Sequence, residues 1–514
     1  MKSVILWADD EIDLLKPHIM FLTAKGYEVI TANSGSDALS HVAERHVDLV
    51  ILDENMPGLS GLDVLTRIKQ SWPHLPVIMI TKSEEEDIMD QAIGGKIADY
   101  LIKPVNPNQI LLSIKKTLDS GRLVAARTST SYREEFGRIT SQINDSYTLA
   151  DWKELYRRIV YWQMELDSAA DIAPLLESQT DEANAAFGKF VRRNYEKWIS
   201  ANVAEAPLMS HNLLRRKVTP MVADGKRPWL IVVDNFRLDQ WLTLKPLLSA
   251  DFTFADEELY CSILPTATQY ARNAIFSGLL PEEIASRYPA LWIDEDSPES
   301  KNLNEAPLID GLIERMRQPW KFSYHKINDS EACRKLAERV ADYAGNDFNV
   351  AVINFIDMLS HARTENHAVR ELASTDAAYR SITGSWFRHS PALTLFSRIA
   401  ATGAPIVLTT DHGTIRVDTP VKIVADRFTS TGLRYKVGKN MDYDPRKVYE
   451  IKRPKAYGLP APNLSSAYIF ATGRDFFVYP NNYNHFVQHF TDTFQHGGIS
   501  LEEMLVPVVT LRPK

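Results

Sequence analysis

The stretch Asp48-Leu-Val-Ile-Leu-Asp-Glu-Asn-Met-Pro-Gly58 decides the fold of the first part of the chain. A short apolar run over 48–52 leads directly into Asp53 and then into turn-forming residues. Similar runs at 4–8, 28–32, 77–80 and 100–102 alternate with segments of helical spacing, such as 11–25 and 61–70. This alternation is typical of a parallel, doubly wound α/β sheet, whose functional residues lie at the carboxyl ends of the strands.

Polar residues stand at those strand ends. Asp9, Asp10 and Asp53 offer three carboxylates, and Thr81 and Lys103 follow the last two strands. Carboxylates suit a hard divalent ion, for which we expect Mg²⁺. The ion would neutralise a phosphoryl group on Asp53, and Lys103 and Thr81 would contact the phosphoryl oxygens.

These residues and their order resemble the receiver domain of two-component response regulators, over residues 1–118. The resemblance implies a CheY-like fold and a sensor histidine kinase that phosphorylates Asp53. It also implies that Thr81 and Tyr100 form a switch pair, with Lys103 beside them. The alternative is a flavodoxin-like domain with incidental acidic loops, which would need five matching strand-end positions by chance.

Residues 119–215 have a different character. Trp152, Leu155 and Tyr156 begin one apolar stripe of helical spacing, and a second stripe starts at Phe187. We expect a helical-bundle connector, including a stalk that relays the state of the first domain, and no catalytic group in it.

Composition sets the outer bounds. The 514 residues carry a formal net charge of -8, which argues against a protein that binds duplex DNA, and no helix-turn-helix pattern is recognisable. Two cysteines provide no disulfide framework and no cysteine-based zinc site. Acidic residues come too early for a signal peptide, and no apolar run reaches membrane-spanning length. We therefore expect a cytoplasmic protein without a membrane partner.

The last part of the chain, 216–514, delivers metal-type ligands from several strands. A predicted strand over 229–233 leads into Asp234, one over 349–356 leads into Asp357 and His361, and one over 405–409 leads into Asp411 and His412. Mixtures of carboxylate and imidazole suit Zn²⁺, with Mn²⁺ as the alternative. Two such ions would stabilise the attacking and the leaving oxygen of an in-line displacement.

A hydroxyl group completes this chemistry. Thr268 lies in the turn Pro265-Thr-Ala-Thr268, before a predicted helix whose N-terminus favours an incoming phosphate. Metal coordination would lower the pKa of the hydroxyl enough for nucleophilic attack. A final ligand, His496, precedes two glycines in a predicted loop. His485 and His489, four residues apart, form a competing pair, which we interpret as part of an ordinary helix face.

These segments resemble the alkaline phosphatase superfamily, especially its nucleotide pyrophosphatase/phosphodiesterase branch and the bacterial PglZ domain. The resemblance implies a larger α/β domain in which Thr268 is the nucleophile, and Thr266 is the competing choice. Asn235 replaces a frequent glycine, and Arg272 is a candidate phosphate contact. One ion would take Asp234, Thr268, Asp411 and His412, and the other would take Asp357, His361 and His496.

The three parts in this order resemble response regulators linked to type IX secretion. That resemblance implies homodimerisation on phosphorylation of Asp53 and control of secretion genes through a sigma factor. We expect a metal-dependent phosphodiesterase with a nucleotide or oligonucleotide substrate. The alternative is a phosphorylation-dependent adaptor, binding for example a sigma factor, whose output-domain metals are mainly structural.

Overall fold

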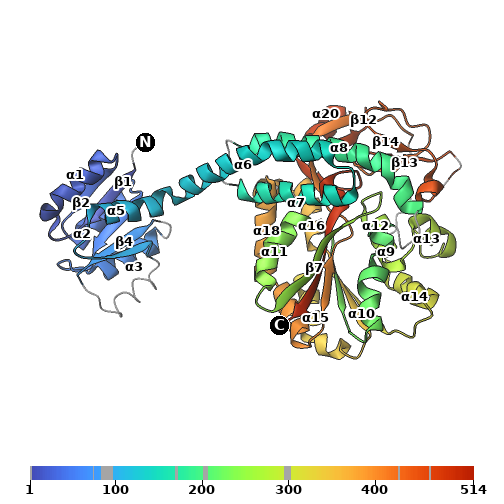
Figure 1. Cartoon of the computed structure of the whole chain (residues 1–514), viewed down its shortest axis with the longest axis horizontal. Coiled ribbons are helices and arrows are strands. Elements are labelled where there is room, and N and C mark those ends of the chain that lie inside the picture. Colours follow the sequence, from blue (N-terminus) through green and yellow to red (C-terminus); the bar gives the residue numbers. More distant parts are fainter. Residues whose placement is uncertain are drawn as a thin grey trace. The chain divides into compact units, whose positions relative to one another are not determined.

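A computed structural model describes residues 3–72, 75–82, 97–167, 172–200, 206–293, 303–426, 429–461, 463 and 465–514. Inside two of its helices, the side chains of 119–129 and 367–368 are not described. The chain forms two compact units, Met1–Ser131 and Tyr132–Lys514 (Figure 1).

The first unit is a five-stranded parallel sheet with the strand order β2-β1-β3-β4-β5. Alternate residues of β1 enter different cores: Leu6 packs with α2 and α3, whereas Ile5 and Trp7 pack with α1 and α5. The predicted doubly wound sheet is therefore confirmed, with helices on both faces. Its elements are β1 Val4–Ala8, a 3-10 turn Ile12–Leu15, α1 Lys16–Ala24, β2 Glu28–Ala32, α2 Gly35–Glu44, β3 Leu49–Asp53, α3 Gly61–Ser71, β4 Val77–Thr81, β5 Asp99–Ile102 and α5 Pro107–Ile114.

The predicted connecting helices are present. A π-helical turn over Lys115–Asp119 leads into α6 Ser120–Asp145, which is followed by α7 Leu149–Glu165 and α8 Ala173–Ser200. Trp152 of α7 and Phe187 of α8 belong to the same hydrophobic core as Trp229 and Trp241 of the α/β domain. The helices also pack on one another, through the ring contacts Trp152–Phe187 and Tyr132–Trp162. The predicted helical connector is therefore present, and its apolar stripes pack against the α/β domain as well.

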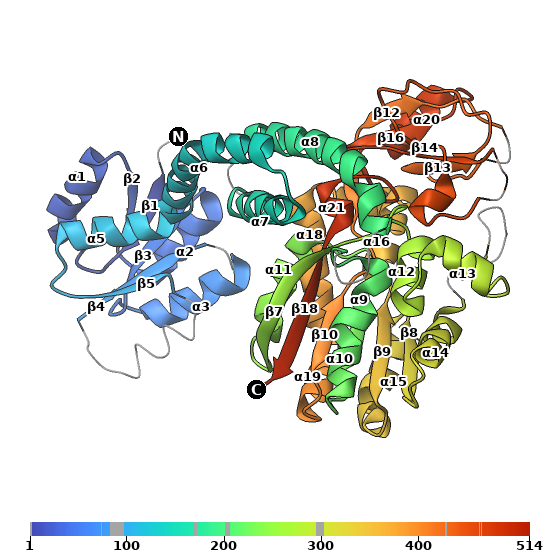
Figure 2. The same ribbon diagram turned by 45° about the vertical axis from the view of Figure 1, so that its right-hand side comes forward.

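The second unit is built on a six-stranded mixed sheet with the order β7-β18-β10-β6-β9-β8. Four neighbouring strands are parallel, and β18 runs antiparallel to both β10 and β7. Figure 2 shows helices on both sides of this sheet. The strands are β6 Trp229–Val233, β7 Phe252–Cys261, β8 Phe322–Ile327, β9 Phe348–Ile353, β10 Ile406–Thr409 and β18 Leu505–Pro513.

The helices of this domain pack on the two faces of the sheet and around its carboxyl edge. They are α9 Ser210–Leu213, α10 Thr219–Ala223, α11 Leu238–Leu248, α12 Thr268–Ser277, α13 Pro281–Arg287, α14 Glu305–Arg315, α15 Ser330–Glu338, α16 Phe355–Glu365, α17 His367–Leu372, α18 Asp376–His389, α19 Pro391–Ala401, α20 Tyr483–Phe490 and α21 Leu501–Met504, with shorter turns at Leu214–Val218, Val340–Tyr343 and Pro454–Tyr457. No helix in the described ranges is long and apolar enough to cross a membrane.

The predicted strand over 349–356 is wrong in its last residues. Strand β9 ends at Ile353, and α16 begins at Phe355. Asp357 and His361 therefore lie four residues apart on a helix, which places both side chains on one face. The two side chains still lie close together, because residues four apart on a helix are neighbours on its surface.

Between β10 and β18 the chain adds three small sheets. They pair β11 with β17, β12 with β16, and β15 with both β13 and β14. Their strands are β11 Ile415–Val417, β12 Thr419–Lys422, β13 Tyr435–Gly438, β14 Tyr449–Ile451, β15 Ala467–Phe470, β16 Asp475–Val478 and β17 Thr493–Gln495. This insertion ends just before His496 and so delivers that residue back to the main sheet.

Candidate functional site

The first cluster lies at the carboxyl edge of the five-stranded sheet. Carboxylate oxygens of Asp9, Asp10 and Asp53 lie within 4.8 Å of one another. Lys103 donates to Asp9 at 2.8 Å and forms an ion pair with Asp53 at 3.0 Å. Burial raises the pKa of Asp53, although Lys103 opposes the rise. Asp53 Oδ1 is buried without a hydrogen-bond donor, and a cation would fill that need, so the residues present fit Mg²⁺.

The predicted switch residues lie beside this cluster. Thr81 is the buried last residue of β4, and its side chain is hydrogen-bonded to Tyr100 of β5. The backbone N–H of Lys103 donates to the carbonyl of Thr81 at 2.7 Å. The structure therefore brings Thr81, Tyr100 and Lys103 together next to Asp53.

A second cluster lies at the carboxyl ends of β6 and β10. Ligand atoms of Asp234, Asp411 and His412 lie within 4.8 Å of one another, and all three residues are buried. The His412 ring can donate from Nδ1 to the carbonyl of Gly413 at 3.1 Å. That bond leaves Nε2 facing the carboxylates, at 4.0 Å from Asp234 Oδ1, which has no hydrogen-bond donor of its own. The donor set fits a divalent metal.

Thr268 reaches this second cluster, whereas Thr266 does not. Thr268 is the first residue of α12, is partly exposed, and places Oγ1 at 3.3 Å from His412 Nε2. The Thr266 hydroxyl is buried, donates to the carbonyl of Gly498 at 2.9 Å and accepts from the Gly497 N–H at 3.0 Å. The hydroxyl of Thr266 is thus used in the fold, and that of Thr268 is available for chemistry.

The third cluster adjoins the second. Ligand atoms of Asp357, His361 and His496 lie within 4.8 Å of one another. The rings of His412 and His496 stack with centroids 4.2 Å apart, which makes the two clusters neighbours. The side chain of His361 is 65% exposed, so this cluster is open to solvent.

The environment of His496 favours the neutral imidazole that binds metals. Burial lowers its pKa, and the nearby imidazoles of His412 and His361 lower it further. Its Nδ1 can donate to the carbonyl of Thr266 at 3.1 Å, which turns Nε2 toward Asp357 Oδ1 at 4.0 Å. A ring held in this way has a fixed orientation, as metal-binding histidines usually do.

Arg272 has a different position from the one the sequence suggested. Its side chain is fully buried on α12. Nε donates to Asp411 Oδ2 at 2.9 Å, Nη1 donates to Glu305 Oε1 at 3.2 Å, and Nη2 is paired with Asp234. Burial opposes ionisation of Asp411, but Arg272 and His412 hold its pKa below the usual range. The prediction that Arg272 contacts phosphate is therefore wrong, because its guanidinium faces carboxylates behind the cluster.

Two supporting residues carry no local signal that identifies their role. Glu305 lies behind Arg272 and also accepts from the hydroxyl of Tyr324. Asn235 directly follows Asp234, and its Nδ2 donates to Asp357 Oδ1 at 3.4 Å while its backbone N–H donates to Asp411 Oδ1 at 3.3 Å. Asn235 has a φ of 61°, a left-handed conformation that asparagine tolerates better than most residues. It thus replaces the expected glycine without losing the turn, and it connects the two clusters.

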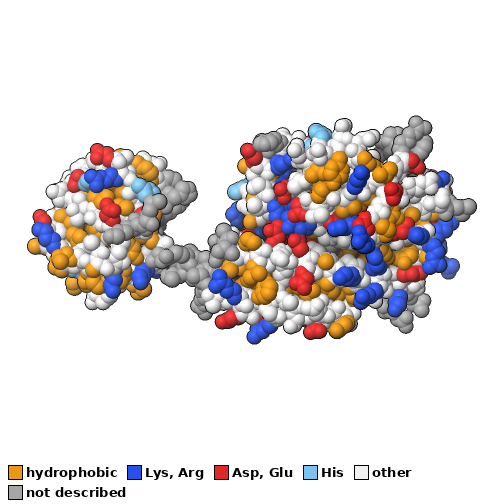
Figure 3. All heavy atoms as spheres, turned by 90° about the horizontal axis from the view of Figure 1, so that it is seen from above, with side chains coloured by type: hydrophobic (Ala, Val, Ile, Leu, Met, Phe, Trp, Pro, Cys, Tyr) orange, Lys and Arg blue, Asp and Glu red, His pale blue; other side chains and the backbone are white. Residues whose placement is uncertain are grey.

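The remaining sequence features lie outside these clusters. His485 and His489 occupy α20, as predicted, and belong to none of the candidate metal groups among the described residues. Residues 427–466 contain many Lys and Arg residues, and several of these cations are paired with acids, including Arg446 with Asp444. On the face of the second unit seen in Figure 3, basic and acidic side chains are interleaved rather than gathered into one basic surface.

Three family models match the chain. The model of the BREX system PglZ alkaline phosphatase-like domain matches residues 213–511, and that of the response regulator receiver domain matches residues 5–115. Between them, residues 122–199 match the PorX response regulator linker domain. The chain therefore has the PorX-like architecture of receiver, helical linker and PglZ domain. Receiver domains act with sensor histidine kinases, and alkaline phosphatase-like domains usually bind metals.

Individual relatives resemble a smaller part of the chain. The alkaline phosphatase synthesis transcriptional regulatory protein PhoP of Bacillus subtilis is 31% identical over 158 residues, which cover 30% of this chain and 64% of PhoP. The transcriptional regulatory protein KdpE of Mycobacterium tuberculosis is 35% identical over 113 residues, covering 22% of this chain and 50% of KdpE. The chain thus spans about half to two thirds of the length of these curated relatives.

Solved structures add matches of similar extent. A response regulator receiver domain protein from Clostridium thermocellum is 34% identical and covers 24% of this chain and 98% of its own, with a TM-score of 0.23. A CheY-like receiver domain protein from Methanospirillum hungatei is 27% identical and covers 23% of this chain and 96% of its own, also with a TM-score of 0.23.

Proposed function

The chain belongs to the family of the BREX system PglZ alkaline phosphatase-like domain, and on that premise we propose that its output domain is a metal-dependent phosphodiesterase. The molecule is a two-component response regulator, with a receiver domain ahead of this output domain. The observation that carries the proposal is the distance of 3.3 Å between Thr268 Oγ1 and His412 Nε2, which sets a partly exposed hydroxyl at the edge of two adjoining ligand clusters. A purely structural metal site has no use for a hydroxyl in that position.

The residues divide into three roles in this proposal. Asp234, Asp411 and His412, with Thr268, would hold one ion, and Asp357, His361 and His496 would hold the other. Bound Zn²⁺ ions, or Mn²⁺ in their place, would lower the pKa of the attacking hydroxyl and neutralise charge on the phosphate oxygens. Arg272 and Asn235 position the carboxylates from behind.

The proposed reaction is an in-line displacement at phosphorus. The Thr268 oxygen loses its proton and forms a bond to phosphorus, while the bond from phosphorus to the leaving oxygen breaks. The leaving oxygen departs with the electron pair and takes up a proton. Water then hydrolyses the phosphothreonine ester and restores Thr268. The amino end of α12, where Thr268 lies, favours the anionic phosphate throughout.

Input to this site would come from the receiver. We assign Asp53 as the residue that accepts a phosphoryl group from a histidine kinase, with Mg²⁺ on Asp9, Asp10 and Asp53. Phosphorylation would promote homodimerisation. The resemblance to PorX, which the linker match over residues 122–199 extends, implies a role in type IX secretion exerted through a sigma factor, and we include it in the proposal. The nucleotide or oligonucleotide substrate is part of the same proposal.

The test uses the full-length protein with Zn²⁺ and bis(p-nitrophenyl) phosphate. We expect release of nitrophenol that stops on chelation and returns on addition of metal. A panel of mono-, di- and cyclic nucleotides would then define the substrate. A zinc-loaded protein that binds both ions and hydrolyses none of these compounds would instead support the adaptor, in which the metals are structural.

A further inference from the structure

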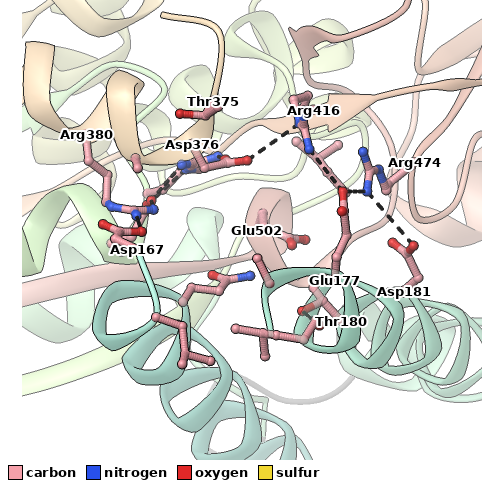
Figure 4. A pocket seen from close by; sticks show the side chains of 18 of the residues that line it. Asp167, Glu177, Thr180, Asp181, Thr375, Asp376, Arg380, Arg416, Arg474 and Glu502 are labelled. Atoms are coloured by element: carbon pink, nitrogen blue, oxygen red, sulfur yellow. Dashed lines mark hydrogen bonds and ion pairs between the residues drawn. The ribbon is translucent and has the colours of Figure 1, made fainter. Parts of the chain in front are cut away.

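A cavity of about 370 Å³ lies between the connecting helices α7 and α8 and the α/β domain (Figure 4). The helices contribute Tyr156 and Thr180 to its wall, and the α/β domain contributes Asp376 and Glu502. None of the seven predicted output-domain metal ligands lines it. The volume lies in the range of ordinary small-molecule sites, which are roughly 300–1,000 Å³.

The charges around the cavity do not balance. Its wall contains four guanidinium groups and six carboxyl groups. Figure 4 shows the arginines engaged with acidic side chains around the cavity. The ion pairs include Arg237–Asp376 at 2.6 Å, Arg380–Asp167 at 2.5 Å, Arg416–Glu177 at 3.0 Å and Arg474–Glu177. Asp239 also pairs with Arg237 and Arg380, and Asp181 lies 4.0 Å from Arg474. Because every guanidinium already has a carboxylate partner, the wall offers no free cation to an anionic ligand.

Glu502 is the carboxyl group of the wall that forms no ion pair with these arginines, although Arg237 is near enough to lower its pKa. Asn184 donates from Nδ2 to Glu502 Oε2 at 3.1 Å. Among the described residues, no basic side chain lies within ion-pair distance of Glu502. Burial raises the pKa of Glu502 to about 7, and Asn184 only partly opposes this. Glu502 is half-buried and lines the cavity, so a cation that enters the cavity would stabilise its carboxylate.

We propose that the cavity binds a small aliphatic amine or guanidine, with its cationic group on Glu502. Leu166, Leu176 and Ile415 also line the cavity and provide apolar surface for an alkyl chain. A metal ion fits less well, because Glu502 belongs to no cluster of ligand atoms within 4.8 Å among the described residues. An alkyl chain with one cationic end matches both the apolar wall and the excess of carboxyl groups.

The cavity touches segments that also carry the predicted catalytic ligands. Glu502 lies six residues after His496 in the chain, and Arg416 lies four residues after His412. If the output domain is the proposed phosphodiesterase, we expect a bound cation to influence the segments that carry His412 and His496. That coupling rests on the proposed function, whereas binding itself does not, so binding is the quantity to measure.

The experiment is calorimetric titration of the full-length protein at pH 8 with three probes of equal chain length: hexylammonium, 1-hexanol and hexanoate. We expect hexylammonium to bind with one site per chain, hexanol to bind at least about tenfold more weakly, and hexanoate not to bind. Binding of hexanoate at least as tight as that of hexylammonium would overturn the proposal, as would the absence of hexylammonium binding.

Two variants locate the site. Glu502→Gln keeps the shape and an acceptor for Asn184, and we expect it to weaken hexylammonium binding by about tenfold or more. Ala377→Phe narrows the cavity without changing charge, and it too should weaken binding, which keeps the test decisive if Glu502→Gln fails to fold. Glu338→Gln, an exposed change on α15, is the matched control and should bind like the wild type. Unchanged affinity in the folded cavity variants would contradict the assignment.

Discussion

Arg272 donates from Nε to Oδ2 of Asp411 at 2.9 Å, and both side chains are fully buried. The same guanidinium pairs with Asp234 and Glu305. It therefore compensates three carboxylates at once and orients two of them toward the position where a metal would bind. An arginine is suited to this task because its planar fork donates in several directions and stays charged.

Removing Arg272 should destabilise the metal-free protein most. Arg272→Met leaves buried carboxylates without a counter-charge, a loss of about 3–5 kcal/mol in the free energy of unfolding. Zinc would replace much of the missing positive charge. With a chelator present, we expect the unfolding temperature of Arg272→Met to lie far below that of the wild type. Addition of Zn²⁺ should reduce this difference. Arg272→Lys should lie between them. An equal loss with and without metal would argue against this role.

Asn235 offers a paired test of the connection between the two clusters. Asn235→Gly removes the amide that donates to Asp357 but accepts the φ of 61° without strain, whereas Asn235→Ala adds a backbone cost of about 1–2 kcal/mol. Both variants should bind the zinc of the Asp357 cluster more weakly, and only Asn235→Ala should also lose stability. Zinc stoichiometry and urea unfolding separate the effects. Wild-type zinc affinity in Asn235→Gly would show that the hydrogen bond from Asn235 to Asp357 has no role in metal binding.

Much of the site could be predicted because strand ends are visible in the sequence. Asp53, Asp234 and Asp411 each follow a run of apolar residues, and the carboxyl ends of parallel strands meet at one edge of a sheet. The structure brings His361 and Asp357 together, as the sequence predicts, although both residues lie on a helix. In that case the spacing of four residues mattered more than the type of element.

Other features could not be predicted because they depend on packing between distant segments. Glu305 meets Arg272 only when α14 packs against α12, and nothing near Glu305 in the sequence indicates a buried acid. Likewise, the apolar stripes of α7 and α8 predict helices but not the surface that covers them. Their burial against the α/β domain creates the cavity beside Glu502, which no single segment encodes.

The receiver makes a prediction about assembly. Beryllofluoride or acetyl phosphate should raise the dimer fraction of the wild type in sedimentation velocity, because a phosphoryl group on Asp53 would displace the ion pair with Lys103 and change the surroundings of Thr81. Asp53→Ala should not respond. A sedimentation profile that does not change in the wild type, or that changes equally in Asp53→Ala, would count against control through Asp53.

Glu502 makes stability depend on pH. Its pKa is about 7 in the folded protein and near its ordinary value of 4.5 in the unfolded chain, so the folded state binds the proton more tightly. The raised pKa therefore adds to the free energy of unfolding, and this contribution is fully present below about pH 4.5. It is lost as the pH rises through 7, and the loss is roughly 3 kcal/mol at most. We expect Glu502→Gln to be more stable than the wild type at pH 8 and similar at pH 4.5, by urea unfolding without ligand. Parallel pH profiles of the two proteins would contradict this.

The central claim, that the output domain cleaves phosphodiesters through Thr268, is tested most directly by measuring zinc-dependent hydrolysis of bis(p-nitrophenyl) phosphate in a threonine series. Thr268→Val is nearly isosteric and lacks only the hydroxyl, Thr268→Ser restores a hydroxyl, and Thr266→Val removes the neighbouring hydroxyl that is used in the fold. The account predicts that Thr268→Val keeps most of its zinc and loses turnover by a factor of about 1,000 or more. Thr268→Ser should keep partial activity. Folded Thr266→Val should still turn over substrate. Turnover in zinc-loaded Thr268→Val equal to that of the wild type would contradict it.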